Sequence, residues 1–170
     1  MNPMSWSFRA RFLAGFVACA GLLAYALYAQ YHDGLLPCPL CTFQRGAFIA
    51  LAAVFLLGGL FGPKGCGWRT FWAVLALLPA LGGIGIAGRH LWLQHLPADQ
   101  VPACGPDLSY MMQAFPFTDV IRKVFTGSGE CAKVDWTFLG LAMPAWSLIW
   151  FVLLAAWAVL AACRRASACR

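Results

Sequence analysis

The amino-acid sequence predicts an all-α membrane protein, a bundle of four transmembrane helices with one long loop on its outer side. Hydrophobic residues make up 62% of the 170 residues, above the roughly 45 to 50% of soluble domains. Charged residues make up only 11%. They leave four uncharged stretches close to or above the roughly 17 to 20 residues that an apolar helix needs to cross a bilayer. These stretches are residues 12–31, 46–63, 70–88 and 136–163.

We expect one integral membrane domain over residues 1–170. The predicted helices cover about residues 12–31, 43–62, 70–89 and 138–162, and the predicted outer loops cover about 32–40 and 90–137. The first stretch follows two arginines, as the apolar part of a signal peptide does. It is too long for a signal peptide and has no clear small-residue cleavage site, so we expect it to remain as the first helix.

Local sequence supports the second and third helices. Pro37 and Pro39 disfavour a helix before this point, while Pro39 suits a first helical position, so the second helix should begin here. In the third stretch, Pro79 is expected to bend the helix. Gly83 and Ala87 have the small-xxx-small spacing that allows close helix packing.

The charges predict that both termini are cytoplasmic, because Lys and Arg accumulate on the cytoplasmic side of short loops. Basic residues without any acidic residue occur in the N-terminal segment, the middle loop and the C-terminal segment. All six acidic residues lie in the other two loops: Asp33, Asp99, Asp107, Asp119, Glu130 and Asp135. This topology explains the net charge of +6 and leaves little support for nucleic-acid binding.

The eight cysteines divide evenly between the two sides. The outer loops contain Cys38, Cys41, Cys104 and Cys131, and the first helix and the cytoplasmic segments contain Cys19, Cys66, Cys163 and Cys169. Disulfides persist in oxidising compartments and are rare in the cytoplasm, so only the outer four are candidates for pairing. We expect the inner four to be reduced and to act as small apolar residues.

The two outer pairs differ in what a disulfide would contribute. Cys38 and Cys41 form a C-x-x-C motif, and closing so small a ring stabilises a fold by about 1.9 kcal/mol, against about 3.6 kcal/mol for the segment from Cys104 to Cys131. The short pair is therefore better explained by reactivity than by stability. For the long pair, a structural role and an exchange role are about equally favoured.

Cys41 is expected in the first turn of the second helix. Free backbone N–H groups and the positive end of the helix dipole favour a thiolate there. Arg45 follows four residues later on the same face and would add a positive charge. An arginine near a helix end often extends to the lipid head groups, but an arginine aligned with Cys41 favours a functional partner.

The outer end of the third helix carries a polar cluster of Arg89, His90 and Gln94. His90 and Gln94 share a face at the i, i+4 spacing. Such residues commonly anchor a helix at the membrane surface or form hydrogen bonds within a bundle. Beside a C-x-x-C motif they could instead bind a polar head group.

The long outer loop carries the second cysteine pair. Pro102 and Pro106 flank Cys104 and favour an extended, accessible backbone. Residues 118–125 predict a short amphipathic helix with Thr118 as its N-cap, lying on the membrane surface. The segment 127–129, Gly-Ser-Gly, predicts a flexible hinge before Cys131, which suits a cysteine that changes partners.

Other classes of protein are less well supported. Structural zinc sites usually combine two closely spaced cysteine pairs, whereas Cys104 and Cys131 are far apart, so we expect no metal. Haem attachment requires His after a C-x-x-C motif, and Thr42 follows Cys41. A scaffold held together by disulfides would gain little from the short pair.

The sequence resembles the family of bacterial disulfide bond formation protein B (DsbB). The resemblance covers nearly the whole chain and rests on Cys38-Pro-Leu-Cys41-Thr-Phe-Gln-Arg45, on Arg89-His90-Leu-Trp-Leu-Gln94, and on the lone Cys104 and Cys131 in one outer loop. Proteins of the vitamin K epoxide reductase type also combine a helical bundle, a C-x-x-C motif and a quinone, but the loop pair fits DsbB better. The four inner cysteines have no role in the family pattern.

The resemblance implies a thiol:quinone oxidoreductase of the bacterial inner membrane, with the long loop in the periplasm. It implies disulfides Cys38–Cys41 and Cys104–Cys131. A reduced DsbA-like thiol oxidase would attack Cys104, and the released Cys131 would attack Cys38 and free Cys41 as a thiolate. Cys41 would pass electrons to ubiquinone or menaquinone. Arg45 would stabilise negative charge, and Gln94 and His90 would lie near the quinone head group.

Overall fold

Four long helices make up most of the described chain. The structure, a computed structural model, describes residues 7–32, 34, 37–62, 65–97, 99–101, 108–116, 118–120, 122, 129–132, 134 and 136–163. The long helices are α1 (Phe8–His32), α2 (Pro39–Phe61), α3 (Cys66–Gln94) and α7 (Met143–Cys163). Each is long and apolar enough to cross a membrane. The prediction of a four-helix membrane protein is confirmed.

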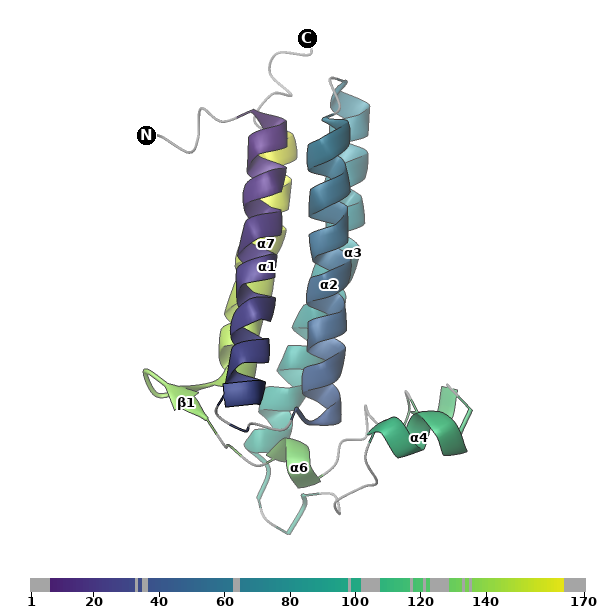
Figure 1. The fold of residues 1–170 in the computed structure, drawn as a ribbon, viewed down its shortest axis with the longest axis vertical. Coiled ribbons are helices and arrows are strands. Elements are labelled where there is room, and N and C mark those ends of the chain that lie inside the picture. The colour runs from purple at the N-terminus through teal and green to yellow at the C-terminus, as the bar shows by residue number, and fades with distance from the viewer. Residues whose placement is uncertain are drawn as a thin grey trace.

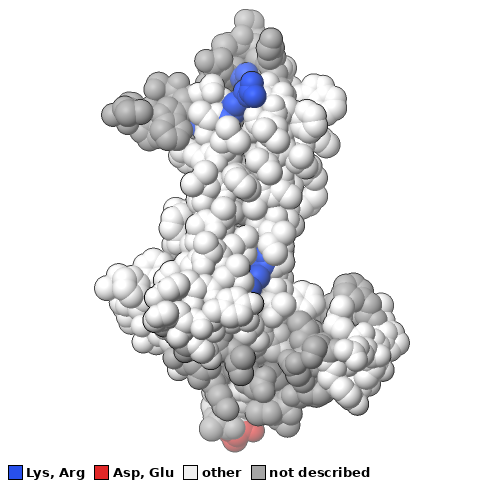
Figure 2. All heavy atoms as spheres, viewed as in Figure 1, with Lys and Arg blue, Asp and Glu red and all other residues white. Residues whose placement is uncertain are grey.

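The four helices stand side by side in one bundle (Figure 1). The first residues of α1 and the last residues of α7 lie at the same end. The opposite end carries the short helices α4 (Leu108–Ala114) and α6 (Gly129–Ala132) and a hairpin of β1 (Thr137–Phe138) and β2 (Leu141–Ala142). Figure 2 shows basic atoms near the first end, acidic atoms at the loop end and, between them, a mostly uncharged surface with one further basic patch. The side of the membrane that each end faces stays a prediction.

Helix α2 begins and ends as its sequence dictates. Cys38 is its N-cap, with extended backbone angles, and Pro39 is the first helical residue. The helix ends at Gly62, which has the left-handed φ of 50° and donates its N–H to the carbonyl of Gly58 at 3.1 Å. Glycine adopts this conformation without the cost that a Cβ adds. Cys41 therefore lies in the first turn of α2, as predicted from Pro37 and Pro39.

Helix α3 extends beyond the predicted residues 70–89 at both ends. In its last turns Arg89 stacks on Trp92, with 4.1 Å from the guanidinium carbon to the ring centre. Its first residue, Cys66, is disulfide-bonded to a partner outside the described residues. The expectation that all inner cysteines are reduced is thus wrong for Cys66, because an argument from compartment does not consider which cysteines lie close together. Cys19 and Cys163 are free, as expected.

Helix α7 begins at Met143, later than the predicted residue 138. The preceding residues form the β1–β2 hairpin, whose turn at Leu139 and Gly140 has φ values of 52° and 77°. Positive φ at both turn positions matches the twist of paired strands. Trp146 of α7 donates its indole N–H to the carbonyl of Phe138 at 3.1 Å and fastens the hairpin to the helix. Uncharged composition alone does not separate this hairpin from the helix.

The long loop contains structure that the sequence reading missed. Helix α4 was not predicted. Thr118, Asp119, Val120 and Arg122 are helical, but the rest of the amphipathic helix predicted over residues 118–125 lies outside the described residues, so this helix stays a prediction. Cys104 and most of the predicted hinge at 127–129 also lie outside the described residues.

Small residues allow the helices to pack closely around a core of aromatic rings. Gly83 of α3 and Gly58 of α2 lie directly against the rings of Phe151 and Phe12, and a Cβ at either glycine would overlap its ring. Phe48 stacks on Phe151, with ring centres 3.9 Å apart. Lipid is as apolar as these side chains, so close packing rather than water exclusion holds the helices together.

We predict that Gly83→Ala destabilises the bundle, whereas the matched variant Gly85→Ala does not. Both substitutions favour the helix equally, but only the methyl group at Gly83 collides with Phe151, since nothing lies within 4 Å of a Cβ at Gly85. Overpacking of this kind costs about 1 to 3 kcal/mol. Unfolding of the two purified variants in detergent measures the difference, and equal stability would show that α3 and α7 do not pack through Gly83.

Candidate functional site

The C-x-x-C motif lies at the start of α2, where it forms the cap of the helix. The Cys38 sulfur accepts the backbone N–H of Cys41 at 3.4 Å, and Thr42 donates its backbone N–H to the Cys38 carbonyl at 3.1 Å. Both cysteines are half-buried and free. The Cys38–Cys41 disulfide is not formed in this structure and stays a prediction. The N–H contact gives the Cys38 sulfur a hydrogen-bond donor where it lies.

His90 of α3 reaches across to both cysteines. Its ring is buried, with 2% of its surface exposed. Its Nε2 atom lies 3.7 Å from the Cys38 sulfur and its Nδ1 atom lies 4.0 Å from the Cys41 sulfur. The structure therefore brings His90, which was predicted only as a possible ligand of a head group, into direct contact with the redox motif.

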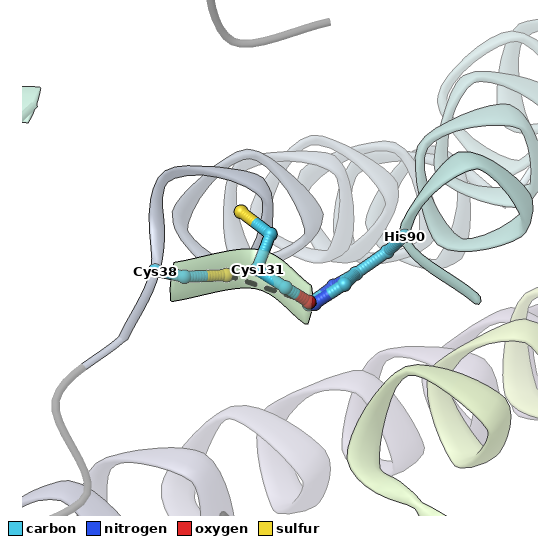
Figure 3. Close-up of side chains that lie close together, drawn as sticks. All are labelled: Cys38, His90 and Cys131. Atoms are coloured by element: carbon cyan, nitrogen blue, oxygen red, sulfur yellow. Dashed lines mark hydrogen bonds between the residues drawn. The ribbon is translucent and has the colours of Figure 1, made fainter. Parts of the chain in front are cut away.

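Cys131 joins the same cluster from the loop, as Figure 3 shows. It lies in α6 and is 1% exposed. Its backbone carbonyl is 3.1 Å from His90 Nε2, and its sulfur, the Cys38 sulfur and a ring nitrogen of His90 all lie within 4.8 Å of one another. A disulfide needs about 2.05 Å between its sulfurs, so a small movement of side chains would bring Cys38 and Cys131 to bonding distance.

Gln44 is a site residue that the sequence reading missed. It is buried, with 4% of its surface exposed, and its Nε2 atom lies 3.2 Å from His90 Nδ1. A backbone carbonyl only accepts hydrogen bonds, so the contact with Cys131 assigns the proton of His90 to Nε2. Nδ1 then accepts a hydrogen bond from the Gln44 amide. Gln44 follows Cys41 by three residues, and this helical spacing could have identified it.

Arg45 binds helix α1. Its guanidinium donates to the side-chain oxygen of Gln30 and, at 3.0 Å, to the carbonyl of Ala26. It is half-buried within the bundle rather than extended to lipid head groups. Both of these partners are uncharged, so the positive charge is held one turn below Cys41 without being neutralised by them.

The described contacts place His90, and not Gln94, against the cysteines. Gln94 is half-buried at the last residue of α3, one turn beyond His90. Arg89 is occupied with Trp92. A role for Gln94 beside a head group stays a prediction, as does the role of Cys104.

An apolar cluster covers the site on the loop side. It contains one residue from each of α2, α3, α4, the 118–122 segment and α6: Leu40, Leu93, Met111, Val120 and Cys131. Cys131 is 1% exposed, so bulk solvent has little access to its sulfur. In a dry site, the donors that contact the sulfurs act more strongly than they would in water.

An apolar cavity of about 520 Å³ lies on the neighbouring face, between α2 and α3. Thr42 and Phe43 line its end nearest the C-x-x-C motif, Ile86 lines it from α3, and Met112 of α4 borders it. Its walls are almost entirely carbon, so it suits an apolar group of a ligand.

Comparison with known proteins identifies the family of the chain. The family model described as "Disulfide bond formation protein DsbB" matches residues 8–161. Disulfide bond formation protein B of Xanthomonas campestris pv. campestris (strain 8004) is 56% identical over 161 residues, covering 95% of this chain and 94% of the relative. Disulfide bond formation protein B of Xylella fastidiosa (strain Temecula1) is 48% identical over 155 residues, covering 91% and 90%.

We predict that His90 in the reduced protein carries its proton on Nε2. The Cys131 carbonyl accepts a hydrogen bond from the Nε2–H group, and the Gln44 amide donates a hydrogen bond to Nδ1. Nitrogen NMR of histidine-labelled protein distinguishes the two tautomers, with His32→Gln and His95→Gln used to assign signals. The variant Gln44→Leu should weaken this preference. A His90 ring protonated at Nδ1 alone would contradict the assignment.

Proposed function

Because the chain belongs to the DsbB family, we propose that it oxidises a periplasmic DsbA-like thiol oxidase and passes the electrons to a membrane quinone. Family membership makes it a multi-pass membrane thiol–disulfide oxidoreductase of disulfide bond formation. The partner, the quinone, the bacterial inner membrane and the cytoplasmic position of both termini belong to the proposal. The identity of the quinone, ubiquinone or menaquinone, is left open.

The observation that carries the proposal is the contact of Cys131 with the C-x-x-C motif. Electrons taken from a partner at the loop must reach Cys41, and this requires one loop cysteine to approach Cys38. The sulfurs of Cys131 and Cys38 lie within 4.8 Å of each other although they are far apart in the sequence. A purely structural loop disulfide does not require this approach.

The proposed exchange conserves bonds and electrons at each step. A thiolate of the reduced partner attacks Cys104, forms a mixed disulfide and releases Cys131 as a thiolate. Cys131 attacks Cys38, the Cys38–Cys41 bond breaks, and a Cys38–Cys131 bond forms while Cys41 leaves as a thiolate. A second partner thiolate then completes the partner's disulfide and displaces Cys104. A stable leaving thiolate favours this order of exchange steps.

The residues around Cys41 suit the charge that develops there. Cys41 is in the first turn of α2, where the helix dipole favours a negative sulfur. Arg45 holds its positive charge one turn away through Gln30 and Ala26. His90 Nδ1 lies 4.0 Å from the Cys41 sulfur, and it would accept the thiol proton once the Gln44 amide releases it.

A quinone fits this set of residues. When bound, it would supply a two-electron acceptor that also takes up two protons. Arg45 would stabilise negative charge at the acceptor, and His90 would hold a proton at Nδ1. The apolar cavity beside Thr42 suits the hydrocarbon chain of a membrane quinone.

The direct test mixes purified protein with reduced DsbA and ubiquinone and follows the loss of quinone absorbance. We expect catalytic turnover that depends on all three components. Absence of turnover with both ubiquinone and menaquinone would contradict the proposal.

Cys131→Ser should trap the partner as a stable mixed disulfide on Cys104. Serine cannot form the Cys38–Cys131 bond or displace the partner, so the first adduct accumulates. Non-reducing electrophoresis and peptide mapping locate the bond, and Cys163→Ser, which removes an exposed cysteine at the other end of the bundle, is the control. Absence of an adduct, or an adduct on Cys38, would overturn the order of attack.

Arg45→Ala should slow quinone reduction at least tenfold while changing partner binding less than threefold. These factors are order-of-magnitude expectations for removing one charge that stabilises a reacting anion. Arg9→Ala is the charge-matched control, since Arg9 contacts the carbonyls of Gly59 and Leu60 at the far end of α2. Equal quinone kinetics in the two variants would exclude a role for Arg45 in electron transfer.

A further inference from the structure

We propose that, when the cysteines are reduced, Cys38, His90 and Cys131 bind a thiophilic cation such as Zn²⁺, and that the bound cation blocks disulfide exchange. This site differs from the four-cysteine zinc site considered from the sequence. It uses one cysteine from each pair together with a histidine, and it goes beyond the proposed thiol and quinone chemistry.

The spacing of the three ligand atoms suits a tetrahedral cation. With bonds of roughly 2.3 Å to sulfur and 2.0 Å to nitrogen, a tetrahedral site holds its sulfur and nitrogen ligands roughly 3.5 Å apart. Cys38 Sγ and His90 Nε2 are 3.7 Å apart. All three ligand atoms lie within 4.8 Å of one another, so the Cys131 sulfur must approach by roughly 1 Å, which a side-chain rotation provides.

Charge and burial also favour the cation. His90 and Cys131 are 2% and 1% exposed. Binding releases one proton from each thiol, and the two thiolates neutralise the charge of Zn²⁺, so the buried complex carries no net charge. Cys38 is half-buried and gives the cation access to the site. Three protein ligands leave the fourth position for water, as in many zinc sites.

Gln44 is placed to support His90 as a ligand. Coordination through Nε2 replaces the hydrogen bond from Nε2 to the Cys131 carbonyl and moves the proton to Nδ1, which then needs an acceptor. The Gln44 amide lies 3.2 Å from Nδ1, and turning the amide over replaces its N–H₂ group by its oxygen. A hydrogen bond from the second ring nitrogen orients a metal-binding histidine and strengthens its coordination. Gln44 can therefore form a hydrogen bond with the free His90 ring, protonated on Nε2, and with the cation-bound ring, protonated on Nδ1.

The redox state controls the site. A Cys38–Cys41 or Cys104–Cys131 disulfide removes a thiolate ligand, so only the protein with both Cys38 and Cys131 reduced binds the cation. While bound, the cation holds the attacking Cys131 and its target Cys38 as metal ligands. Zinc would therefore accumulate on reduced enzyme that lacks an electron acceptor.

Co²⁺ provides a spectroscopic test on the full-length protein in detergent. Reduced, air-free protein should bind one Co²⁺ with a thiolate-to-cobalt charge-transfer absorption, and Zn²⁺ should displace it. The absorption should be absent from the oxidised protein and return on reduction. Cys131→Ser and His90→Ala should lose it, Gln44→Leu should bind at least tenfold more weakly, and Cys163→Ser should match the unmodified protein.

Full absorption in either Cys131→Ser or His90→Ala, or none in the reduced unmodified protein, would overturn the site. The comparison of oxidised with reduced unmodified protein does not depend on whether a variant folds. The measurement needs neither the partner nor a quinone. Its failure is therefore distinct from failure of the proposed oxidoreductase reaction.

Discussion

The hydrogen bond from His90 to the backbone carbonyl of Cys131 is the interaction on which the site depends. It joins the membrane bundle to a loop segment, since His90 belongs to α3 and Cys131 to α6. Both groups are buried, so loss of the bond would leave a polar group unsatisfied at a cost of about 1 to 3 kcal/mol. The bond also sets the proton of His90 on Nε2, so the lone pair of Nδ1 accepts the Gln44 amide N–H while the Cys41 sulfur lies 4.0 Å away. One contact thus fixes the position of Cys131 and the chemical state of the ring that faces Cys41.

The start of α2 couples folding to redox chemistry. Cys38 caps the helix with its sulfur, a role that serine or asparagine usually fills with oxygen. The N–H that it binds belongs to Cys41, so the contact that begins the helix also holds the two cysteines of the motif together. Both of their sulfurs face His90 of α3. Arg45 then fixes α2 to α1 through Gln30 and Ala26. The charge beneath Cys41 is consequently part of the helix packing and is positioned before any substrate binds.

Much of the fold was predictable from the sequence because lipid imposes a simple requirement. A backbone in hydrocarbon must satisfy its own hydrogen bonds, so a long uncharged stretch is a helix. The same rule failed at residues 137–142, where the chain precedes α7 at the loop end of the bundle and Leu139 and Gly140 form a turn within an uncharged stretch. Pro39 located the start of α2 because its effect on the backbone is local.

The site was predictable only in part. Cys41 and Arg45 share a helix face, and a spacing of four residues reveals that directly. His90 lies close to Cys38, and Cys131 lies close to both, because the start of α2, helix α3 and helix α6 pack together. No local sequence pattern encodes this packing. Gln44 was overlooked because a glutamine beside an arginine looks like an ordinary polar residue near a helix end. Its burial against His90 is what distinguishes it.

The way in which Cys131 is held explains how a buried cysteine can still exchange. Helix α6 has four residues, too few to be stable alone. Its position depends on the His90 hydrogen bond, worth about 0.5 to 1.5 kcal/mol, and on apolar contacts with Leu40, Leu93, Met111 and Val120. These contacts come from short loop elements on one side and from the rigid ends of α2 and α3 on the other. Under the proposed exchange, Cys131 would move with this short helix, whereas Cys38 and Cys41 belong to the long helix that they begin. The two cysteine pairs differ for this reason: one lies at the start of a bundle helix, and the other contributes a cysteine from a short loop helix.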